Sequence, residues 1–367
     1  MPEIGIGARV RKSPFFDATV EAGATMFTIY NHMYMPISYG DPMREYSALT
    51  ERVCIWDVAA ERQVEIVGPQ AAELTQRLSA RDLSKCKVGR ARYAPMCDHD
   101  GHLINDPVIL KLAEDRFWLS IADLDILLWA KAVSGEGDYD ADVFEPDASP
   151  LGIQGPNAED LVAELLGDWV RDVPFFGHAW AKLDGIPMVV CRSGWSHQGG
   201  FELFLTNSDR GTDLWNLAWD AGQKYGIAPG GPHFQERVES DLLSFGADHP
   251  LDADPFEVGL GNLVNLDAAH DFIGKAALIA KRDQGQRRAR VGLHLDGEPI
   301  LNVDSPWELN LDGESVGSLR VGVLSPKFER NIGIGFIDIA GAQVGTELVA
   351  LGPDGPRVAT VVPLPFS

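Results

Sequence analysis

The sequence predicts an α+β protein with a duplicated core and an all-β carboxyl-terminal domain. Two patterns carry this prediction: a strand–turn–helix unit that occurs twice, and a run of short alternating strands near the carboxyl end. The chain has 367 residues, of which 45% are hydrophobic and 23% charged. Such a length and composition are typical of a globular protein of two or three domains.

The repeat lies at residues 64–74, Val-Glu-Ile-Val-Gly-Pro-Gln-Ala-Ala-Glu-Leu, and at 151–161, Leu-Gly-Ile-Gln-Gly-Pro-Asn-Ala-Glu-Asp-Leu. In each copy an apolar stretch ends in Gly-Pro. Apolar residues then recur at helical spacing, and proline is favoured in the first turn of a helix. Two such units predict a pseudo-duplicated core in which helices cover one side of the sheets.

The other elements are read in chain order. Two short strands are expected within 53–66, and the aromatic and Met-rich segment 27–36 is either core or pocket wall. A turn is expected at 98–101, a strand at 117–121, and Asp106 at the start of a strand. Helices are expected at 208–225, with Ser208 as N-cap and Gly226 as the stop, and at about 233–245; residues 281–290 are expected to form a solvated linker before a small β-barrel.

Composition excludes several classes of protein. The formal net charge of −23 argues against nucleic-acid binding, which depends on accumulated Lys and Arg. No apolar run is long enough for a membrane-spanning helix, and the first twelve residues lack the apolar region of a secretory signal, so a cytoplasmic protein without membrane contact is expected.

Neither the cysteines nor the histidines indicate a metal centre. The four cysteines are scattered without a Cys-x-x-Cys pair, which predicts neither a disulfide framework nor a zinc site. His99, His102 and Asp106 lie close together in the sequence, but exposed turn histidines explain the pattern more simply. No metal is therefore expected.

The stretch 192–205, Arg-Ser-Gly-Trp-Ser-His-Gln-Gly-Gly-Phe-Glu-Leu-Phe-Leu, holds the most suggestive chemistry. Alternation along a strand sets Glu202 and Phe204 on one face. The polar loop before it carries Trp195 and suits a flat or cationic ligand. The alternative is a hairpin in which Trp195 fills the core and Glu202 faces water.

Arg237 falls on the apolar stripe of the helix expected at 233–245 and needs a partner there. A salt bridge to a structural carboxylate and a contact with an anionic ligand satisfy its charge equally well. Both interpretations stay open at the level of sequence.

Several motifs in register resemble the aminomethyltransferase (glycine-cleavage T-protein) superfamily along nearly the whole chain, most closely its dimethylsulfoniopropionate demethylase branch. The general motifs are Trp56-Asp-Val, Val64-Glu-Ile-Val-Gly-Pro, Gly101-His-Leu-Ile-Asn-Asp, Asp271-Phe-Ile-Gly-Lys and Val361-Val-Pro-Leu-Pro-Phe. The branch-specific ones are Tyr30-Asn-His-Met, Asn105-Asp-Pro-Val, Ser120-Ile-Ala-Asp, Arg192-Ser-Gly-Trp-Ser and Gln198-Gly-Gly.

The resemblance implies a three-domain, cloverleaf-like fold with a folate-binding region at 1–280, made of two interleaved α+β subdomains, and a barrel at 286–367. It implies transfer of a methyl group from a sulfonium, most closely dimethylsulfoniopropionate, to N5 of tetrahydrofolate. Asp106 would be the catalytic carboxylate near N5. The implied folate residues are Tyr93, Asp106, Ser120, Glu202 and Arg237, and the implied donor residues are Tyr30, His32, Trp195 and Phe204.

The chain departs from this branch at three positions. Phe201 and Phe204 stand where the branch has tyrosine, and His197 stands where it has lysine. A lost phenol removes a hydrogen-bond donor suited to a substrate carboxylate, so the identity of the donor stays open.

The alternatives are another sulfonium, quaternary ammonium or methoxy donor, or a glycine-cleavage aminomethyltransferase. A noncatalytic folate-binding module is disfavoured because its Lys-Gly-Cys-Tyr-x-Gly-Gln-Glu motif is missing from the sequence. The expected partners are the small-molecule donor and tetrahydrofolate, with a homodimer considered as the assembly.

Overall fold

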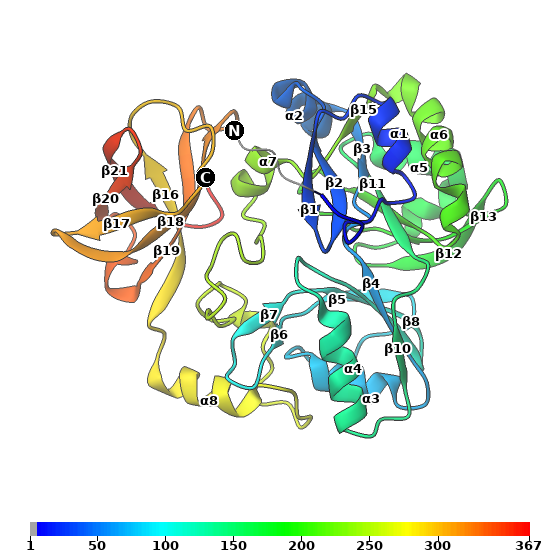
Figure 1. Ribbon diagram of the computed structural model, residues 1–367, viewed down its shortest axis with the longest axis horizontal. Coiled ribbons are helices and arrows are strands. Elements are labelled where there is room, and N and C mark those ends of the chain that lie inside the picture. The colour runs from blue at the N-terminus through cyan, green and yellow to red at the C-terminus, as the bar shows by residue number, and fades with distance from the viewer. Residues whose placement is uncertain (1–5) are drawn as a thin grey trace. The chain divides into compact units, whose positions relative to one another are not determined.

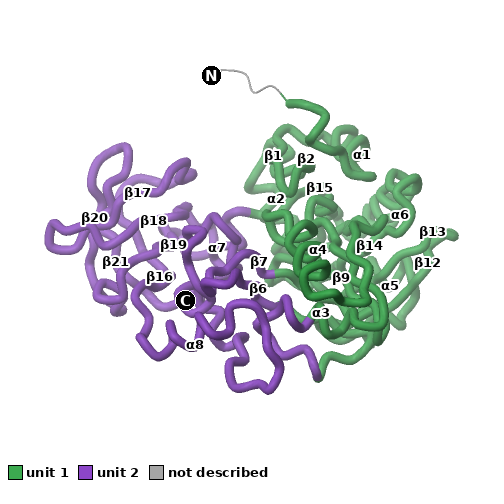
Figure 2. Tube along the Cα trace, turned by 60° about the horizontal axis from the view of Figure 1, so that its bottom comes forward, with its two compact units in different colours: residues 1–75, 85–93, 107–233 green, residues 76–84, 94–106, 234–367 purple. Residues whose placement is uncertain are grey.

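The computed structural model describes residues 6–367, which divide into two compact units (Figure 2). The first unit contains the chain up to Thr75 together with Lys85–Tyr93 and Pro107–His233. The second contains Gln76–Ser84, Ala94–Asp106 and Phe234–Ser367. The chain therefore passes between the units several times before the carboxyl-terminal barrel begins.

Two sheets build the first unit (Figure 1). All neighbouring strands in them are antiparallel, except that β15 runs parallel to β3. The six-stranded sheet has the order β12 (His178–Leu183), β13 (Ile186–Cys191), β14 (Gly200–Leu205), β11 (Ser149–Gln154), β3 (Val53–Asp57), β15 (Ile227–Gly230), and the five-stranded sheet has the order β10 (Asp142–Phe144), β4 (Gln63–Val67), β9 (Arg116–Ser120), β8 (Val108–Ala113), β5 (Arg90–Tyr93).

The six-stranded sheet has a core on each face. On one face, residues such as Ile153 and Leu203 pack against α5 (Ala158–Leu166) and α6 (Gly211–Gly222). On the other, Val189 and Phe204 meet Leu110 and Trp118 of the five-stranded sheet. The sheet is thus covered by helices on one side, as predicted.

The repeat is confirmed as two strand–turn–helix units, β4 with α3 (Ala71–Leu78) and β11 with α5. Both turns need glycine, because Gly68 and Gly155 have φ of 137° and 125°. A Cβ on Gly155 would lie 2.7 Å from the carbonyl oxygen of Arg52. No side chain fits at that distance, so the Gly-Pro pair marks where each strand must turn into its helix.

Short elements complete the first unit. The aromatic segment forms a hairpin of β1 (Met26–Tyr30) and β2 (Met33–Ser38). Its rings cluster with Phe16 of the preceding helix: the Phe16 and Phe27 centroids lie 5.2 Å apart and those of Phe16 and Tyr34 5.3 Å apart. The remaining helices are α1 (Phe16–Glu21), α2 (Pro42–Glu51) and α4 (Ile126–Glu136), which lies against β10 (Figure 1).

The second unit contains the predicted closed barrel. Its strand order is β16 (Arg288–Leu295), β19 (Arg330–Asp338), β18 (Glu314–Ser325), β17 (Trp307–Leu311), β20 (Glu347–Gly352), β21 (Gly355–Val362). The hairpin of β6 (Met96–Cys97) and β7 (Leu103–Asn105) confirms the turn expected at 98–101 and belongs to this unit, as do α7 (Phe234–Glu239) and α8 (Lys275–Gln284).

Three expectations were wrong in detail. The span 208–225 is helical as expected, as α6 flanked by 3₁₀ turns, and Gly226 ends it with φ 72°, but Ser208 does not cap α6, because its hydroxyl donates to Asp147. The helix α7 ends at Glu239, and Asp241 then adopts φ 58°. Residues 281–284 belong to α8, and strand β16 begins at Arg288, so the expected linker is only a short connection.

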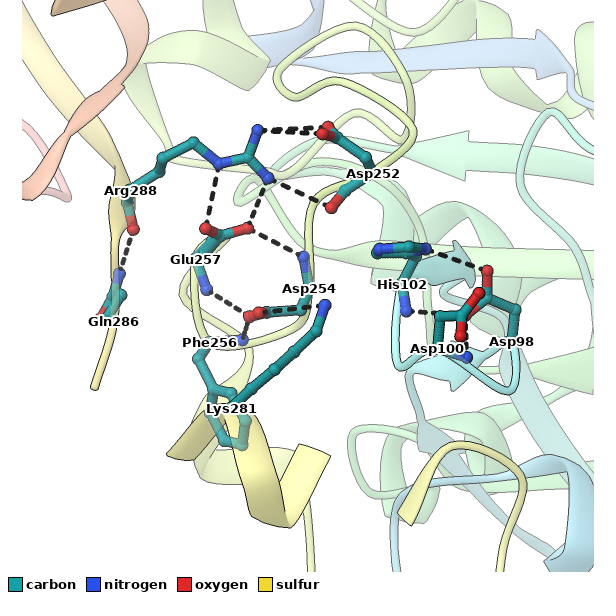
Figure 3. A network of polar contacts seen from close by, with 10 residues as sticks. All are labelled: Asp98, Asp100, His102, Asp252, Asp254, Phe256, Glu257, Lys281, Gln286 and Arg288. Atoms are coloured by element: carbon teal, nitrogen blue, oxygen red, sulfur yellow. Dashed lines mark hydrogen bonds and ion pairs between the residues drawn. The ribbon is translucent and has the colours of Figure 1, made fainter. Parts of the chain in front are cut away.

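Ion pairs join distant segments of the second unit (Figure 3). Arg288 at the start of the barrel donates to Glu257 at 3.0 and 2.9 Å and to the carboxylate of Asp252 at 3.2 Å. Lys281 of α8 lies 3.6 Å from Asp254, which also accepts from the backbone N–H of Glu257. These charges are neutralised by carboxylates of the same unit, which explains why this basic stretch is not a free linker.

Candidate functional site

Glu202 lies in the middle of β14, in a row of directly paired residues across the six-stranded sheet. Its neighbours are Gly152 on β11 and Cys191 on β13, and Cys191 pairs with His178. Directly paired residues share a face, so Glu202 points toward the side that carries Phe204. Glu202 is 7% exposed. The alternative in which this carboxylate faces water is therefore wrong.

A serine holds the Glu202 carboxylate. The hydroxyl of Ser193, itself buried, donates to Glu202 Oε2. Burial raises the pKa of Glu202, and the hydrogen bond from Ser193 opposes that rise. A carboxylate has about four acceptor positions, so the contact with Ser193 leaves capacity for a further donor. The group suits a ligand edge that carries N–H donors.

The loop 192–199 is held from both ends. Arg192 donates to the carbonyl oxygens of Arg171 at 3.3 Å and Val173 at 3.2 Å, and pairs with Glu159. At the other end, the Gly155 backbone N–H donates to the carbonyl oxygen of Gly199 at 2.9 Å. An irregular loop with so many anchors is able to present side chains in a fixed position.

The loop presents Trp195 half-buried and His197 exposed. Phe204 is 1% exposed and packs against Trp118, with ring centroids 6.0 Å apart. Phe201, Leu203 and Leu205 lie in the helix-covered core on the opposite face, which confirms the predicted alternation. The roles of Trp195 and Phe204 toward a donor stay predictions.

Tyr93 and Ser120 are brought into one row of the five-stranded sheet. Val108 pairs with both of them, and Ser120 pairs with Gln63. Gln63 donates to Ser120 Oγ at 3.0 Å, and its own buried Oε1 accepts no hydrogen bond from the described residues. The row therefore gathers hydroxyl and amide groups along four adjacent strands, β4, β9, β8 and β5.

Tyr30 ends strand β1, and His32 lies in the turn at the tip of the β1–β2 hairpin. Asn31 and His32 have positive φ values of 46° and 62°, so the chain turns sharply there. Asn31 is buried and donates to the carbonyl oxygens of Ala60 at 3.1 Å and Ala122 at 3.0 Å, whereas His32 is exposed. Asn31 thus anchors the tip that carries both predicted donor residues.

Asp106 belongs to the second unit and is 8% exposed. It follows β7 rather than beginning a strand, and its backbone N–H donates to Asn105 Oδ1 at 3.1 Å. The hairpin that carries it is fastened within this unit by the Leu103 N–H, which donates to the Ala253 carbonyl oxygen at 2.8 Å. Its catalytic role remains a prediction.

Arg237 forms the salt bridge that one of the two sequence interpretations required. It donates to Asp248 Oδ1 at 2.7 Å, and the two side chains are 2% and 0% exposed. Arg290 contacts the other oxygen at 3.3 Å. Burial alone would raise the pKa of Asp248, but the two guanidinium groups outweigh it and hold this pKa below its usual range.

The sequence reasoning missed Gln154 and Ser193. Gln154 donates to the carbonyl oxygens of Ser193 at 3.0 Å and Phe201 at 3.3 Å, and accepts from Ser196 Oγ at 2.8 Å. A signal existed in the repeat, because Gln154 occupies the position of Val67 in the first copy. Where one copy of the repeat has a polar residue and the other an apolar one, the polar side chain indicates a hydrogen-bond partner that the other copy lacks.

Two other features do not gather the predicted site residues. A pocket of about 490 Å³ in the first unit is lined by residues that include Arg62 and Glu145, and these two already pair at 2.5 Å. Asp98, Asp100 and His102 have possible ligand atoms within 4.8 Å of one another (Figure 3). Asp98 there accepts from the backbone N–H groups of Asp100 and His102, as in an ordinary turn.

Among residues 6–367, no helix has the length and apolar character needed to cross a membrane. All four cysteines are buried and carry free thiols. Burial raises the pKa of Cys54 and Cys191 to about 12, so both stay protonated near neutral pH.

Comparison with known proteins matches both parts of the chain. Residues 15–268 match the GCVT N-terminal domain, and residues 288–367 match the glycine cleavage T-protein C-terminal barrel domain. Dimethylsulfoniopropionate demethylase of Ruegeria pomeroyi is 40% identical over 98% of both chains. An aminomethyltransferase of Halalkalibacterium halodurans is 29% identical, over 97% of this chain and 98% of that one.

The fold is shared with a solved structure. The crystal structure of the glycine cleavage system aminomethyltransferase T from Bartonella henselae superposes with a TM-score of 0.87 at 22% identity, covering 98% of each chain. The two family domains, the full-length relatives and this fold confirm the resemblance read from the motifs. The chain belongs to the glycine-cleavage T-protein family.

Proposed function

We propose that this protein transfers a methyl group from dimethylsulfoniopropionate to N5 of tetrahydrofolate. The observation that carries the proposal is the 40% identity, over 98% of both chains, to the demethylase of Ruegeria pomeroyi. Aminomethyltransferases of similar coverage are 29% and 30% identical. The protein is thus a tetrahydrofolate-dependent methyltransferase of the demethylase branch.

The transfer is balanced without a redox step. The bond between the sulfonium sulfur and the methyl carbon breaks, and its electron pair stays on sulfur to give a thioether. The N5 lone pair forms the new bond to carbon, and the N5 proton is released. A sulfonium is already a good leaving group, so the protein mainly has to align the two reactants and exclude water.

The folate role of Glu202 is supported by the chemistry of its surroundings. A buried carboxylate held by Ser193 fits the N–H donors on the edge of a pterin. Tyr93 and Ser120 are assigned to the same substrate, supported by their shared row on the five-stranded sheet. Arg237 keeps its predicted folate role beside its ion pair with Asp248.

Asp106 is assigned the catalytic role. A carboxylate near N5 orients the nucleophile and takes up the proton that the reaction releases. The residue is only 8% exposed, so little bulk water competes for the carboxylate. Asp106 is the residue whose substitution tests the mechanism most directly.

The donor residues are Tyr30, His32, Trp195 and Phe204. An indole ring such as Trp195 attracts a sulfonium through its π-electrons. A different donor, quaternary ammonium or methoxy, is the second candidate, and Phe204 is the observation that favours it. Its ring is packed against Trp118 and offers no hydroxyl to a substrate carboxylate.

The deciding experiment incubates the protein with tetrahydrofolate and one methyl donor at a time. Production of 5-methyltetrahydrofolate and the thioether from dimethylsulfoniopropionate, detected by mass spectrometry, is the expected outcome. Turnover with a quaternary ammonium or methoxy compound alone would replace the donor assignment. Activity only with an aminomethyl-loaded lipoyl carrier would place the protein with the aminomethyltransferases and overturn the proposal.

The assembly and location are proposed as a homodimer in the cytoplasm. Light scattering after gel filtration tests the first, with a mass near twice 40.0 kDa expected. Fractionation of the source cells tests the second. A monomer, or recovery outside the cytoplasmic fraction, would contradict the respective proposal.

A further inference from the structure

Gln154 ends strand β11 and uses both ends of its side-chain amide on the loop that precedes Glu202. Its Nε2 donates to the carbonyl oxygens of Ser193 and Phe201, at 3.0 and 3.3 Å. Its Oε1 accepts from the hydroxyl of Ser196 at 2.8 Å. The side chain is 1% exposed, so these contacts satisfy a group that water does not reach.

The loop is shaped around this amide. A Cβ on Gly194 would lie 2.1 Å from Gln154 Nε2, and a Cβ on Gly200 would lie 2.2 Å from the Ile153 carbonyl oxygen. Both glycines also have φ near +144°, where a side chain is strained. The two glycines therefore let the backbone close on Gln154 from either side.

The internal repeat provides a comparison within the same chain. Val67 stands at the equivalent end of β4, and that copy forms its strand, turn and helix without an amide. The strand–turn–helix unit therefore does not require glutamine at this position. Burying an unpaired amide is costly, so a glutamine at this position needs hydrogen-bond partners. Gln154 finds them in the loop that precedes Glu202.

Ser193 connects the amide to the carboxylate. Its carbonyl oxygen accepts from Gln154, and its hydroxyl donates to Glu202 Oε2. Ser193 is 4% exposed. Gln154 thus fixes the backbone of the residue whose side chain orients Glu202.

We propose that Gln154 is a positioning residue that, through Ser193, holds Glu202 in the orientation that binds the pterin edge of tetrahydrofolate. The inference rests on the proposed function. A carboxylate that is pre-oriented loses less side-chain entropy on binding, so its gain appears in affinity. Gln154 itself needs no contact with the folate.

The first test measures the dissociation constant of tetrahydrofolate by calorimetry under anaerobic conditions. Gln154→Leu and Ser193→Ala are expected to weaken binding about tenfold, the effect of one well-placed polar interaction. Ser193→Thr keeps the hydroxyl and is expected to stay within about twofold of wild type. Equal losses in the alanine and threonine variants would overturn the role of the hydroxyl.

Asn331 offers a matched control in the barrel. Its amide also braces a loop, donating to the carbonyl oxygens of Gly297 and Glu298 at 3.3 and 3.0 Å and accepting from the Ile300 N–H at 2.9 Å. Asn331→Ala is expected to lower the melting temperature as Gln154→Leu does, but to leave folate affinity unchanged. A similar loss of affinity in both would show that general destabilisation is responsible and overturn the inference.

Hydrogen exchange separates this inference from the proposed function. Gln154→Leu is expected to speed exchange of the amides in 193–201 at least tenfold and to leave exchange in the barrel unchanged. If this variant fails to fold, Ser196→Ala replaces it; it removes one contact and should change exchange in the same direction. Unchanged exchange would overturn the inference. A wild-type protein that does not bind tetrahydrofolate would overturn the proposed function and the folate part of this inference. Faster exchange in Gln154→Leu would still support the role of Gln154 in holding the loop.

Discussion

Individual carboxyl groups in this protein differ in pKa because their surroundings differ. Asp57 is 1% exposed, and burial raises its pKa to about 6, although hydrogen bonds from Ser13 and the Ala59 N–H oppose the rise. Asp248 is buried as deeply, yet two arginines hold its pKa below the usual range. The residue type alone does not predict either behaviour.

Asp57 therefore makes stability depend on pH. A carboxyl whose folded pKa lies above its unfolded value stabilises the fold while protonated, and this contribution is lost as pH rises through the folded pKa. The free energy of unfolding of wild type, relative to Asp57→Asn, should fall by about 2 kcal/mol between pH 4 and pH 7, since each pKa unit is worth about 1.4 kcal/mol and the unfolded carboxyl is already partly ionised at pH 4. Urea unfolding at both pH values measures it.

Comparing the two proteins at each pH removes the contribution of other groups. His178 changes the free energy of unfolding in the opposite direction. Burial lowers its pKa to about 4, so its contribution to stability increases as pH rises. That contribution is the same in wild type and in Asp57→Asn. A constant difference between the two proteins across this range would show that Asp57 is not the titrating group.

Asp106→Asn is expected to slow the chemical step about a hundredfold while tetrahydrofolate affinity changes little. The substitution keeps the shape of the side chain and removes its basicity. Single-turnover rates with dimethylsulfoniopropionate, measured across pH, provide the comparison. Wild-type rates throughout would leave Asp106 as a residue of the hairpin end with no catalytic part.

Trp195→Leu is expected to weaken dimethylsulfoniopropionate about tenfold, because a cation–π contact contributes roughly 0.5–2 kcal/mol. In the isostere 4-methylpentanoate an uncharged CH group replaces the sulfonium sulfur, so it loses the same ring area but no cation–π attraction, and its inhibition constant should change far less. Competition assays give both values. Equal losses for the two compounds would mean that Trp195 serves only in packing.

At the scale of elements, glycines decide where strands end. Gly155→Ala should destabilise the protein by about 3 kcal/mol or more, because its Cβ would meet two backbone carbonyl oxygens and its φ is 125°. The control is Gly185→Ala, where φ is 75° and nothing lies within 4 Å. Backbone strain alone should cost about 1 kcal/mol there.

Chemical denaturation of both alanine variants tests this difference. If Gly155→Ala costs no more than Gly185→Ala, the close approach to the backbone of Arg52 and Leu49 is not what requires glycine in the repeat. Gly155→Ala is expected to cost more than Gly185→Ala because the chain around Gly185 has free space to relax, whereas the turn at Gly155 is enclosed by backbone.

At the scale of the whole molecule, ion pairs join segments that lie far apart in the chain. Arg237 of α7 and Arg290 of β16 share Asp248, and Arg288 binds Asp252 and Glu257 (Figure 3). Removing one partner leaves a buried charge poorly compensated, which costs far more than the loss of a surface pair.

Arg237→Leu is accordingly expected to lower the free energy of unfolding by about 3 kcal/mol. Arg330→Leu, which removes an exposed arginine from the barrel, should change it by about 0.5 kcal/mol or less. Unfolding curves of the two variants make the comparison. A small effect on unfolding would show that the ion pair with Asp248 does not govern stability, whereas a loss of tetrahydrofolate affinity would support the proposed folate role of Arg237.

The sequence alone determined the fold class, the repeat, the barrel and the family, because these depend on local patterns and on motifs that stand in register along the chain. Alternation along a single strand was enough to place Glu202 and Phe204 on one face. Helix ends were less predictable: α7 stops at Glu239 although its apolar stripe continues to Leu242, because Asp241 turns the backbone into the left-handed region.

Only the tertiary structure decided which polar groups are partners. It paired Arg237 with Asp248, placed Phe204 against Trp118, and set Gln154 against the loop that carries Trp195. Each of these contacts joins residues from different elements, and no periodicity along the chain encodes such a distance. Burial also raises the pKa of Glu202 and of Asp57, because desolvation depends on all the segments that surround a carboxyl group and not on its neighbours in sequence.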